Sequence, residues 1–148
     1  MGEETGVSGP RRAAGYEIGV LLRKAHRKAA EAFNDVLKPL DIQGRHFGIM
    51  LLLRQHGPLS QRQLIDHLGS DKSAMVRSLD DLEDRQLCVR KPAANDRRAH
   101  AVALTPTGLE VFESAERDAK KVSAELMERF SPAEQAQLVE LLNRFIAD

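Results

Sequence analysis

The stretch KPAANDRRAHAVALT, residues 91–105, places Arg97 and Arg98 between two short runs rich in β-favouring residues. Two such runs around a polar segment predict a β-hairpin with the arginines at its tip. Arginine side chains on a projecting tip can enter the minor groove of DNA, whose narrow, negative interior attracts them. The alternative is a loop tip that is merely soluble, but the hairpin context favours DNA contact.

A second group of polar residues precedes the hairpin. Lys72, Ser73 and Arg77 fall in the N-terminal half of a predicted helix, and Val76 shares their outer face. Arg77 can donate two hydrogen bonds to guanine O6 and N7, a contact worth about 1 to 3 kcal/mol of base discrimination. Lys72 or Ser73 can serve either a base or a phosphate. We therefore expect this half of the helix to enter a major groove.

The net charge of the chain does not indicate a binding partner. The chain of 148 residues has 22 Lys or Arg and 22 Asp or Glu, and residues 60–100 contain eight basic against seven acidic side chains. Any contact with DNA must follow from where the charges lie. Most of the acids lie in the C-terminal half of the same helix, which should point away from the groove. They are Asp80, Asp81, Glu83 and Asp84.

The elements that must position these residues follow from apolar periodicity and capping signals. A long amphipathic helix from about Ile18 should end near Pro39, because the residue before a proline avoids the helical conformation. A second, largely apolar helix is predicted from Ile42 or Gln43 to Gln55 and should form the buried centre. The longest apolar run, residues 47–53, is far too short to cross a bilayer, which needs about 20 residues.

Ser60 followed by Gln63 is a capping box that opens a short helix to about Leu68. Gly69 offers the positive φ of a tight turn, and the next helix should run from a Ser70 or Asp71 cap to about Arg85. Strands are predicted at 87–91 and 100–104, with residues 92–99 as the tip. Two helices follow, from Thr105-Pro106 to about 130 and from Ser131-Pro132 onward.

Helix, helix, glycine turn, helix and hairpin is the order of a winged helix-turn-helix, in which the second helix of the turn motif reads the major groove. The predicted fold class is mainly α with a small β-hairpin wing and long N- and C-terminal dimerisation helices. One domain is expected over 1–148, with dimerisation helices at about 11–40 and 106–148 and the winged part at about 42–104.

Two stretches carry a family resemblance: Leu68-Gly69-x-Asp71-x-Ser73, and residues 79–108, LDDLEDRQLCVRKPAANDRRAHAVALTPTG. Together they resemble the multiple antibiotic resistance regulator (MarR) family of bacterial transcription factors. The resemblance covers about residues 16–147 and is strongest over 58–108. It implies that Asp96 and Arg98 shape the wing, that Arg98 enters the minor groove, and that the chain forms an obligate homodimer with a ligand pocket beside the winged part. Where the family usually has glycine before the first wing strand, this chain has Gln86.

The predicted DNA-binding residues are Ser60, Gln61, Lys72, Ser73, Val76, Arg77, Asp96, Arg97 and Arg98. The chain is interpreted as a sequence-specific repressor, not an enzyme, that needs no cofactor or metal. A two-fold dimer places two recognition helices about 34 Å apart and so requires a pseudo-palindromic operator on double-stranded DNA. The alternative function is a winged-helix protein-interaction module without DNA binding.

A small effector, aromatic or anionic, is expected to release the operator by favouring a conformation that does not bind DNA. In the resembled family the pocket lies near His26, Arg23 and His46, and Arg45 is close by in sequence. The alternative is that these histidines are structural or contact the second subunit. The cluster RKAHRK, residues 23–28, is interpreted as a solvated helix face rather than a phosphate or membrane site.

The single cysteine, Cys88, cannot form an intrachain disulfide, and the N-terminal residues lack the apolar segment of a signal peptide, so a cytoplasmic protein is expected. A peroxide-sensing role for Cys88 is the alternative to a small buried hydrophobe, which its place in a predicted strand favours. His56, His67, His100 and Cys88 lack zinc-ligand spacing, so a zinc sensor would need a site that the fold assembles.

Overall fold

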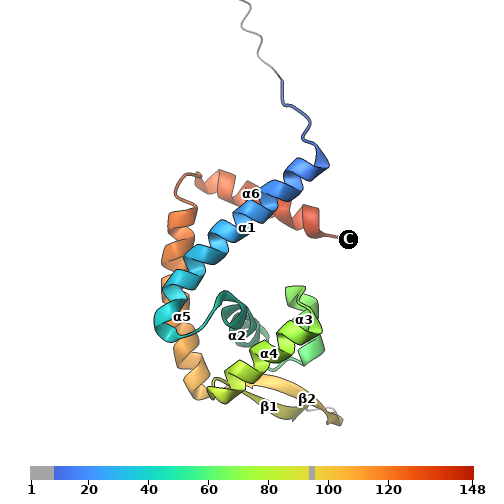
Figure 1. The fold of residues 1–148 in the computed structure, drawn as a ribbon, viewed down its shortest axis with the longest axis vertical. Helices are drawn as coiled ribbons and strands as arrows, with labels where there is room; N and C mark the ends of the chain where they lie inside the picture. The colour runs from blue at the N-terminus through green and yellow to red at the C-terminus, as the bar shows by residue number, and fades with distance from the viewer. Residues whose placement is uncertain (1–8, 94–95) are drawn as a thin grey trace, which may run out of the picture.

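The computed structural model describes residues 9–93 and 96–148. The elements are α1 (Gly15–Leu37), the 3-10 helix η1 (Lys38–Leu40), α2 (Gly44–His56), α3 (Gln61–Leu68), α4 (Lys72–Asp84), β1 (Cys88–Ala93), β2 (Asp96–Leu104), α5 (Pro106–Leu126) and α6 (Pro132–Ile146). Figure 1 shows α2, α3, α4 and the hairpin as one group at one end of the molecule, with α1 and α5 extending from this group and α6 at the other end. The fold is the predicted winged helix-turn-helix with long flanking helices.

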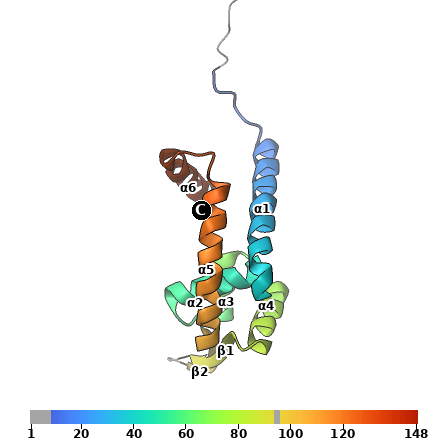
Figure 2. The ribbon, with the colours of Figure 1, turned by 90° about the vertical axis from the view of Figure 1, so that its left-hand side faces the viewer.

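The helical arm consists of α1 and α5, which pack side by side, as Figure 2 shows. α1 ends at Leu37, and η1 carries the chain to Asp41, whose φ of 54° lies in the left-handed region. α2 begins at Gly44, later than predicted, because Ile42 is buried beneath the connection instead of starting the helix. Gln43 caps α2, and its backbone N–H donates to His46 Nδ1 over 3.0 Å.

The helix-turn-helix follows the predicted local signals. Ser60 and Gln63 form the capping box of α3, with Ser60 Oγ accepting from Gln63 N at 3.1 Å. Gly69 ends the helix with a φ of 63°, which glycine adopts without a side-chain clash. Asp71 then caps α4 by accepting from Ala74 N at 2.7 Å. These side chains determine where each of the two helices begins and the angle at which the chain turns between them.

The wing is a two-stranded antiparallel sheet that extends further than the sequence predicted. β1 continues to Ala93 and β2 begins at Asp96, so much of the predicted tip 92–99 belongs to the strands. Pro92 pairs opposite His100, and the register shifts between Pro92 and Ala93. Both strands are edge strands, where proline is tolerated because its missing N–H costs no ladder hydrogen bond. Residues 94 and 95 and the side chain of Arg97 lie outside the described part.

The base of the wing is fastened to α5. Gln86 adopts a φ of 59° near the start of β1. The backbone therefore has the left-handed conformation that glycine favours, although the residue is glutamine. The Thr105 hydroxyl donates to Gln86 O at 2.6 Å and accepts from Gly108 N at 2.9 Å. A Cβ on Gly108 would lie 2.9 Å from the Leu87 carbonyl carbon and closer still to its oxygen. The sequence Thr-Pro-x-Gly therefore joins the wing to α5.

The core surrounds α2, which packs against α1, α3, α4, α5 and β2. Its largest fully buried side chains are Phe112, Leu37, Ile49, Met50, Leu64, Met75, Leu79 and Leu82. Phe47 of α2 stacks on Phe112 of α5, with ring centroids 5.4 Å apart. α2 is thus the buried centre of the winged part, as its apolar composition predicted.

The C-terminal end of α5 differs from the prediction. The apolar spacing predicted helix to Phe130, but α5 ends at Leu126 and a turn follows. Gln135 of α6 donates to Met127 O and Phe130 O, so the turn carbonyls are satisfied outside a helix. No residue of α6 is fully buried, and within the described residues we find no helix with the length and apolarity to cross a membrane.

Candidate nucleic-acid interface

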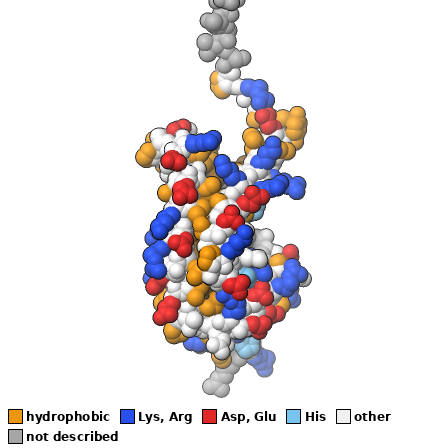
Figure 3. All heavy atoms as spheres, turned by 60° about the vertical axis from the view of Figure 1, so that its left-hand side comes forward, with side chains coloured by type: hydrophobic (Ala, Val, Ile, Leu, Met, Phe, Trp, Pro, Cys, Tyr) orange, Lys and Arg blue, Asp and Glu red, His pale blue; other side chains and the backbone are white. Residues whose placement is uncertain are grey.

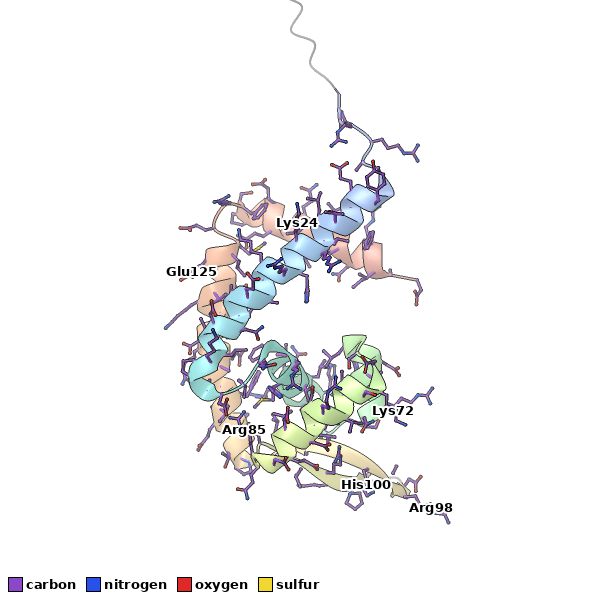
Figure 4. The ribbon with its side chains drawn as sticks, viewed as in Figure 1. Lys24, Lys72, Arg85, Arg98, His100 and Glu125 are labelled. Atoms are coloured by element: carbon purple, nitrogen blue, oxygen red, sulfur yellow. The ribbon has the colours of Figure 1, made fainter. Side chains whose placement is uncertain are left out.

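α4 has one buried and one polar face. Met75, Ser78, Leu79 and Leu82 are buried against the core. Lys72, Ser73 and Arg77 are exposed, and Val76 is half-buried beside them. Because residues three and four apart share a helix face, burial of the first set leaves the second set on the outer side. Figure 4 shows Lys72 pointing away from the body at the start of α4.

The wing tip carries a further exposed cation, Arg98. Asp96 Oδ1 accepts a hydrogen bond from Arg98 N at 2.9 Å, which closes a local turn at the start of β2. The Arg98 side chain is exposed and extends beyond the end of the hairpin in Figure 4, on the same side of the molecule as Lys72. The predicted contact of Arg97 falls on a side chain outside the described residues.

Ser60 and Gln61 lie at the N-terminus of α3 and are half-buried. The Ser60 hydroxyl accepts from Gln63 N, and the first turn of an α-helix leaves backbone amides without an intrahelical acceptor. Such a helix start suits a phosphate oxygen. The geometry therefore brings Ser60, Gln61 and the polar face of α4 to neighbouring surfaces of the helix-turn-helix.

Three of the acids of α4, Asp80, Asp81 and Glu83, pair with cations of the body, which lowers the negative charge that they present beside the outer face. Asp81 Oδ2 accepts from Arg45 at 2.8 Å. Arg90 of β1 forms ion pairs with two acids: its Nη1 lies 2.7 Å from Glu83 Oε2, and its Nη2 lies 3.5 Å from Asp80 Oδ1. Hydrogen bonds from His46 and Arg45 lower the pKa of Asp81, so it stays ionised.

A cavity of about 480 Å³ lies between α1, α2 and α4. Its polar lining includes His26 and Asn34 of α1, Arg45 of α2, and Ser70 and Ser78; Gly48, Ile49 and Met75 provide apolar surface. This volume falls within the range of about 300 to 1,000 Å³ typical of small-molecule sites. The arrangement can hold a small ring with a polar or anionic group.

The three residues predicted to bind an effector are not brought together. His26 lines the cavity, whereas Arg23 is exposed on α1 outside its lining. His46 is buried at 5% exposure and lines a separate concavity with Asp81 and Arg85. Its Nδ1 accepts from Gln43 N and its Nε2 lies 3.2 Å from Asp81 Oδ2, which matches a neutral ring protonated at Nε2. Burial lowers the pKa of His46, and the hydrogen bond to Asp81 opposes that shift.

Sequence reasoning missed the polar contacts that hold α4 to the rest of the chain. Arg45 donates to Ser78 Oγ at 2.9 Å as well as to Asp81. Arg85 donates to Leu40 O at 2.8 Å and also to Asp41 O. The one available signal was Ser78, a polar residue within the apolar stripe of α4.

Cys88 is buried at 3% exposure at the start of β1. Burial, together with the nearby Glu83 carboxylate, raises the pKa of its thiol to about 12. The thiol is therefore protonated at neutral pH, which favours the interpretation as a small hydrophobe. Among the described residues no cluster of three or more His, Cys, Asp or Glu side chains is arranged to hold a metal ion.

The helix-turn-helix, the wing and the outward cations define the chain as a winged helix-turn-helix of the transcriptional-regulator class. Residues 44–100 match the MarR family. The chain resembles a cysteine-to-serine variant of Escherichia coli MarR complexed with operator DNA, with 27% identity, 88% of this chain and 94% of that chain covered, and a TM-score of 0.82. Over residues 44–100 the chain is therefore similar to the MarR family, and its fold is that of the solved MarR structures.

Two further solved structures are similar. A probable transcriptional regulator from Pseudomonas aeruginosa has 26% identity and a TM-score of 0.81, over 88% of this chain and 97% of that chain. Bordetella bronchiseptica BpsR, whose DNA binding is regulated by 6-hydroxynicotinic acid, has 24% identity and a TM-score of 0.81, over 88% and 99%. The second likeness concerns the fold alone.

Proposed function

We propose that the chain is a sequence-specific repressor that binds a pseudo-palindromic operator as a homodimer and leaves it when a small effector binds. One observation carries this proposal: the exposed face of α4 is basic and polar in its N-terminal half, while three of the four acids in its C-terminal half are engaged by Arg45 and Arg90. A groove-facing surface of that charge suits the DNA backbone and base edges.

The homodimer is supported by apolar surface that one chain leaves exposed. On α1, Tyr16, Val20 and Leu21 are 83%, 50% and 57% exposed; on α6, Phe145 and Ile146 are 60% and 72% exposed. Figure 3 shows orange side chains at the outer parts of both helices. Clustered apolar side chains on helices that one chain leaves uncovered are typical of an interface between subunits. Dimerisation through α1, α5 and α6 would present two copies of α4 to successive major grooves, about 34 Å apart.

The effector is proposed to bind in the cavity between α1, α2 and α4. His26 and Arg45 supply polar and cationic groups, and Ile49 and Met75 supply apolar walls. This lining suits an aromatic or anionic molecule. Because the cavity adjoins α4, its occupant can favour a position of α4 that does not fit the operator, and release requires that preference rather than affinity alone.

The proposed function is tested by fluorescence anisotropy on a duplex selected from a random library. Arg98→Ala should weaken binding to all selected sequences and reduce the slope of log K against log salt by about 1. Arg77→Ala should cost about 1 to 3 kcal/mol and relax base preference at one position in each half-site. Arg117→Ala, which removes an exposed arginine of α5, is the matched control and should bind as wild type does.

Two outcomes would count against the proposal. If no salt-sensitive complex with any selected duplex forms, the alternative of a protein-interaction module is favoured. If the complex forms but Arg77→Ala and Arg98→Ala bind like the control, DNA is contacted through another surface.

A further inference from the structure

Arg45 belongs to two sites at once. It lies in the first turn of α2, where it lines the cavity with His26. Its guanidinium also crosses to α4, with Nη1 2.9 Å from Ser78 Oγ and Nη2 2.8 Å from Asp81 Oδ2. The Nε group donates to Gln43 Oε1 at 3.1 Å. A single side chain therefore connects the cavity with the helix that carries Arg77.

The contact with Asp81 can be given up at little cost. The side chains of Arg45 and Asp81 are 43% and 47% exposed, and ion pairs so accessible to water contribute little to stability. A planar guanidinium binds carboxylates through two parallel hydrogen bonds, and such a pair gains strength where water is excluded. Arg45 also lines the cavity, so a carboxylate bound there would compete with Asp81 for the same guanidinium.

We propose that Arg45 couples effector binding in the cavity to the position of α4. An anionic group on the effector binds the Arg45 guanidinium and draws it away from Asp81 and Ser78, so α4 loses the ion pair and the hydrogen bond that connect it to Arg45 of α2. This inference rests on the proposed function. Asp81 then keeps only the neutral His46 as a partner from α2. Ser78 directly follows Arg77 in sequence but on the opposite, buried face, so a rotation of α4 at Ser78 moves Arg77 relative to the groove.

The other end of α4 stays attached during this step. Arg85 is bonded to the carbonyl oxygens of Leu40 and Asp41, in the connection between α1 and α2. Figure 4 shows Arg85 at the end of α4 remote from Lys72. With its C-terminal end held and its middle released, α4 would pivot, and the displacement would be largest at its N-terminal half, where the DNA-facing side chains lie.

The test uses benzoate as a small aromatic carboxylate and benzamide as its uncharged analogue, with wild type, Arg45→Gln, Asp81→Asn and the control Arg117→Gln. In wild type, benzoate should weaken operator binding by roughly 5- to 150-fold, the usual range of allosteric coupling, and benzamide should not. Arg45→Gln should bind the operator more weakly from the start and respond to neither compound. Arg117→Gln should respond as wild type does.

A second readout needs no DNA. The Nε–Hε cross-peak of Arg45 in a ¹⁵N–¹H NMR spectrum is identified by its loss in Arg45→Gln, and benzoate should shift it. Asp81→Asn removes the competing carboxylate, so it should lower the benzoate concentration that gives half of this shift. A merely structural ion pair would not change benzoate affinity in that direction.

The inference is overturned if wild type binds DNA but ignores benzoate, if benzamide acts equally, if Arg45→Gln still responds, or if Asp81→Asn binds benzoate no more tightly than wild type does. If the proposed function itself is wrong, no variant binds any duplex. The NMR titrations would then still show whether Asp81 and benzoate compete for Arg45.

Discussion

Gly108→Ala should strongly destabilise the protein, although alanine is normally the better helix residue. The new Cβ would stand 2.9 Å from the carbonyl carbon and 3.2 Å from the Cα of Leu87. Carbon atoms in ordinary contact are about 3.5 to 4.0 Å apart, so two backbone segments must separate by more than about half an ångström. Both segments lie in the junction between the wing and α5, where no flexible side chain can move aside.

The expected cost combines two effects. Forced displacement in a packed region costs about 1 to 3 kcal/mol. The separation also strains the hydrogen bonds from Thr105 to Gln86 O and Leu87 O, now 2.6 and 3.1 Å long, each worth about 0.5 to 1.5 kcal/mol. The sum is about 2 to 6 kcal/mol, a large part of the about 5 to 15 kcal/mol of a whole domain.

Urea unfolding followed by circular dichroism at one fixed protein concentration measures this cost. With a slope of about 2 kcal/mol per molar urea, the midpoint should fall by about 1 to 3 M. Gly48→Ala in α2 is the matched control, because its Cβ meets only the flexible end of Leu68 at 3.4 Å. That variant should unfold within about 1 kcal/mol of wild type. Equal midpoints for Gly108→Ala and wild type would refute the close approach of α5 to Leu87.

Gln86→Gly should stabilise the protein by about 0.5 to 1 kcal/mol in the same urea assay, because glycine relieves the left-handed strain but loses more chain entropy. Gln86→Ala retains a Cβ and should gain nothing, so equal gains in both variants would exclude strain as the cause. The free energy of unfolding should also fall as pH drops below 6.5, since the unfolded chain takes up a proton that the folded state resists at His46. The loss is at most about 1.4 kcal/mol per pH unit. His46→Gln should flatten this dependence, and an unchanged profile would assign it to other groups.

The sequence by itself determined the secondary structure and its order. The capping boxes at Ser60 and Ser131 and the caps Asp71 and Thr105 accept hydrogen bonds from amides three residues away. The start of each helix can therefore be predicted from a few neighbouring residues. The polar face of α4 was predictable for the same reason, since a helix repeats every 3.6 residues. The predicted bounds were wrong at the end of α5 and in the wing strands, where contacts with other segments outweigh the local sequence preference.

Only the tertiary structure decided how the helices are held together. Arg45 meets Ser78 and Asp81 across 33 and 36 positions, Arg85 meets Leu40 across 45, and Gly108 touches the backbone of Leu87. None of these pairs has a periodic signature, because each depends on the packing of two segments rather than on the conformation of one. The exposed polar face of α4 was therefore predictable from the sequence, while the residues that hold α4 in its position appeared only in the fold.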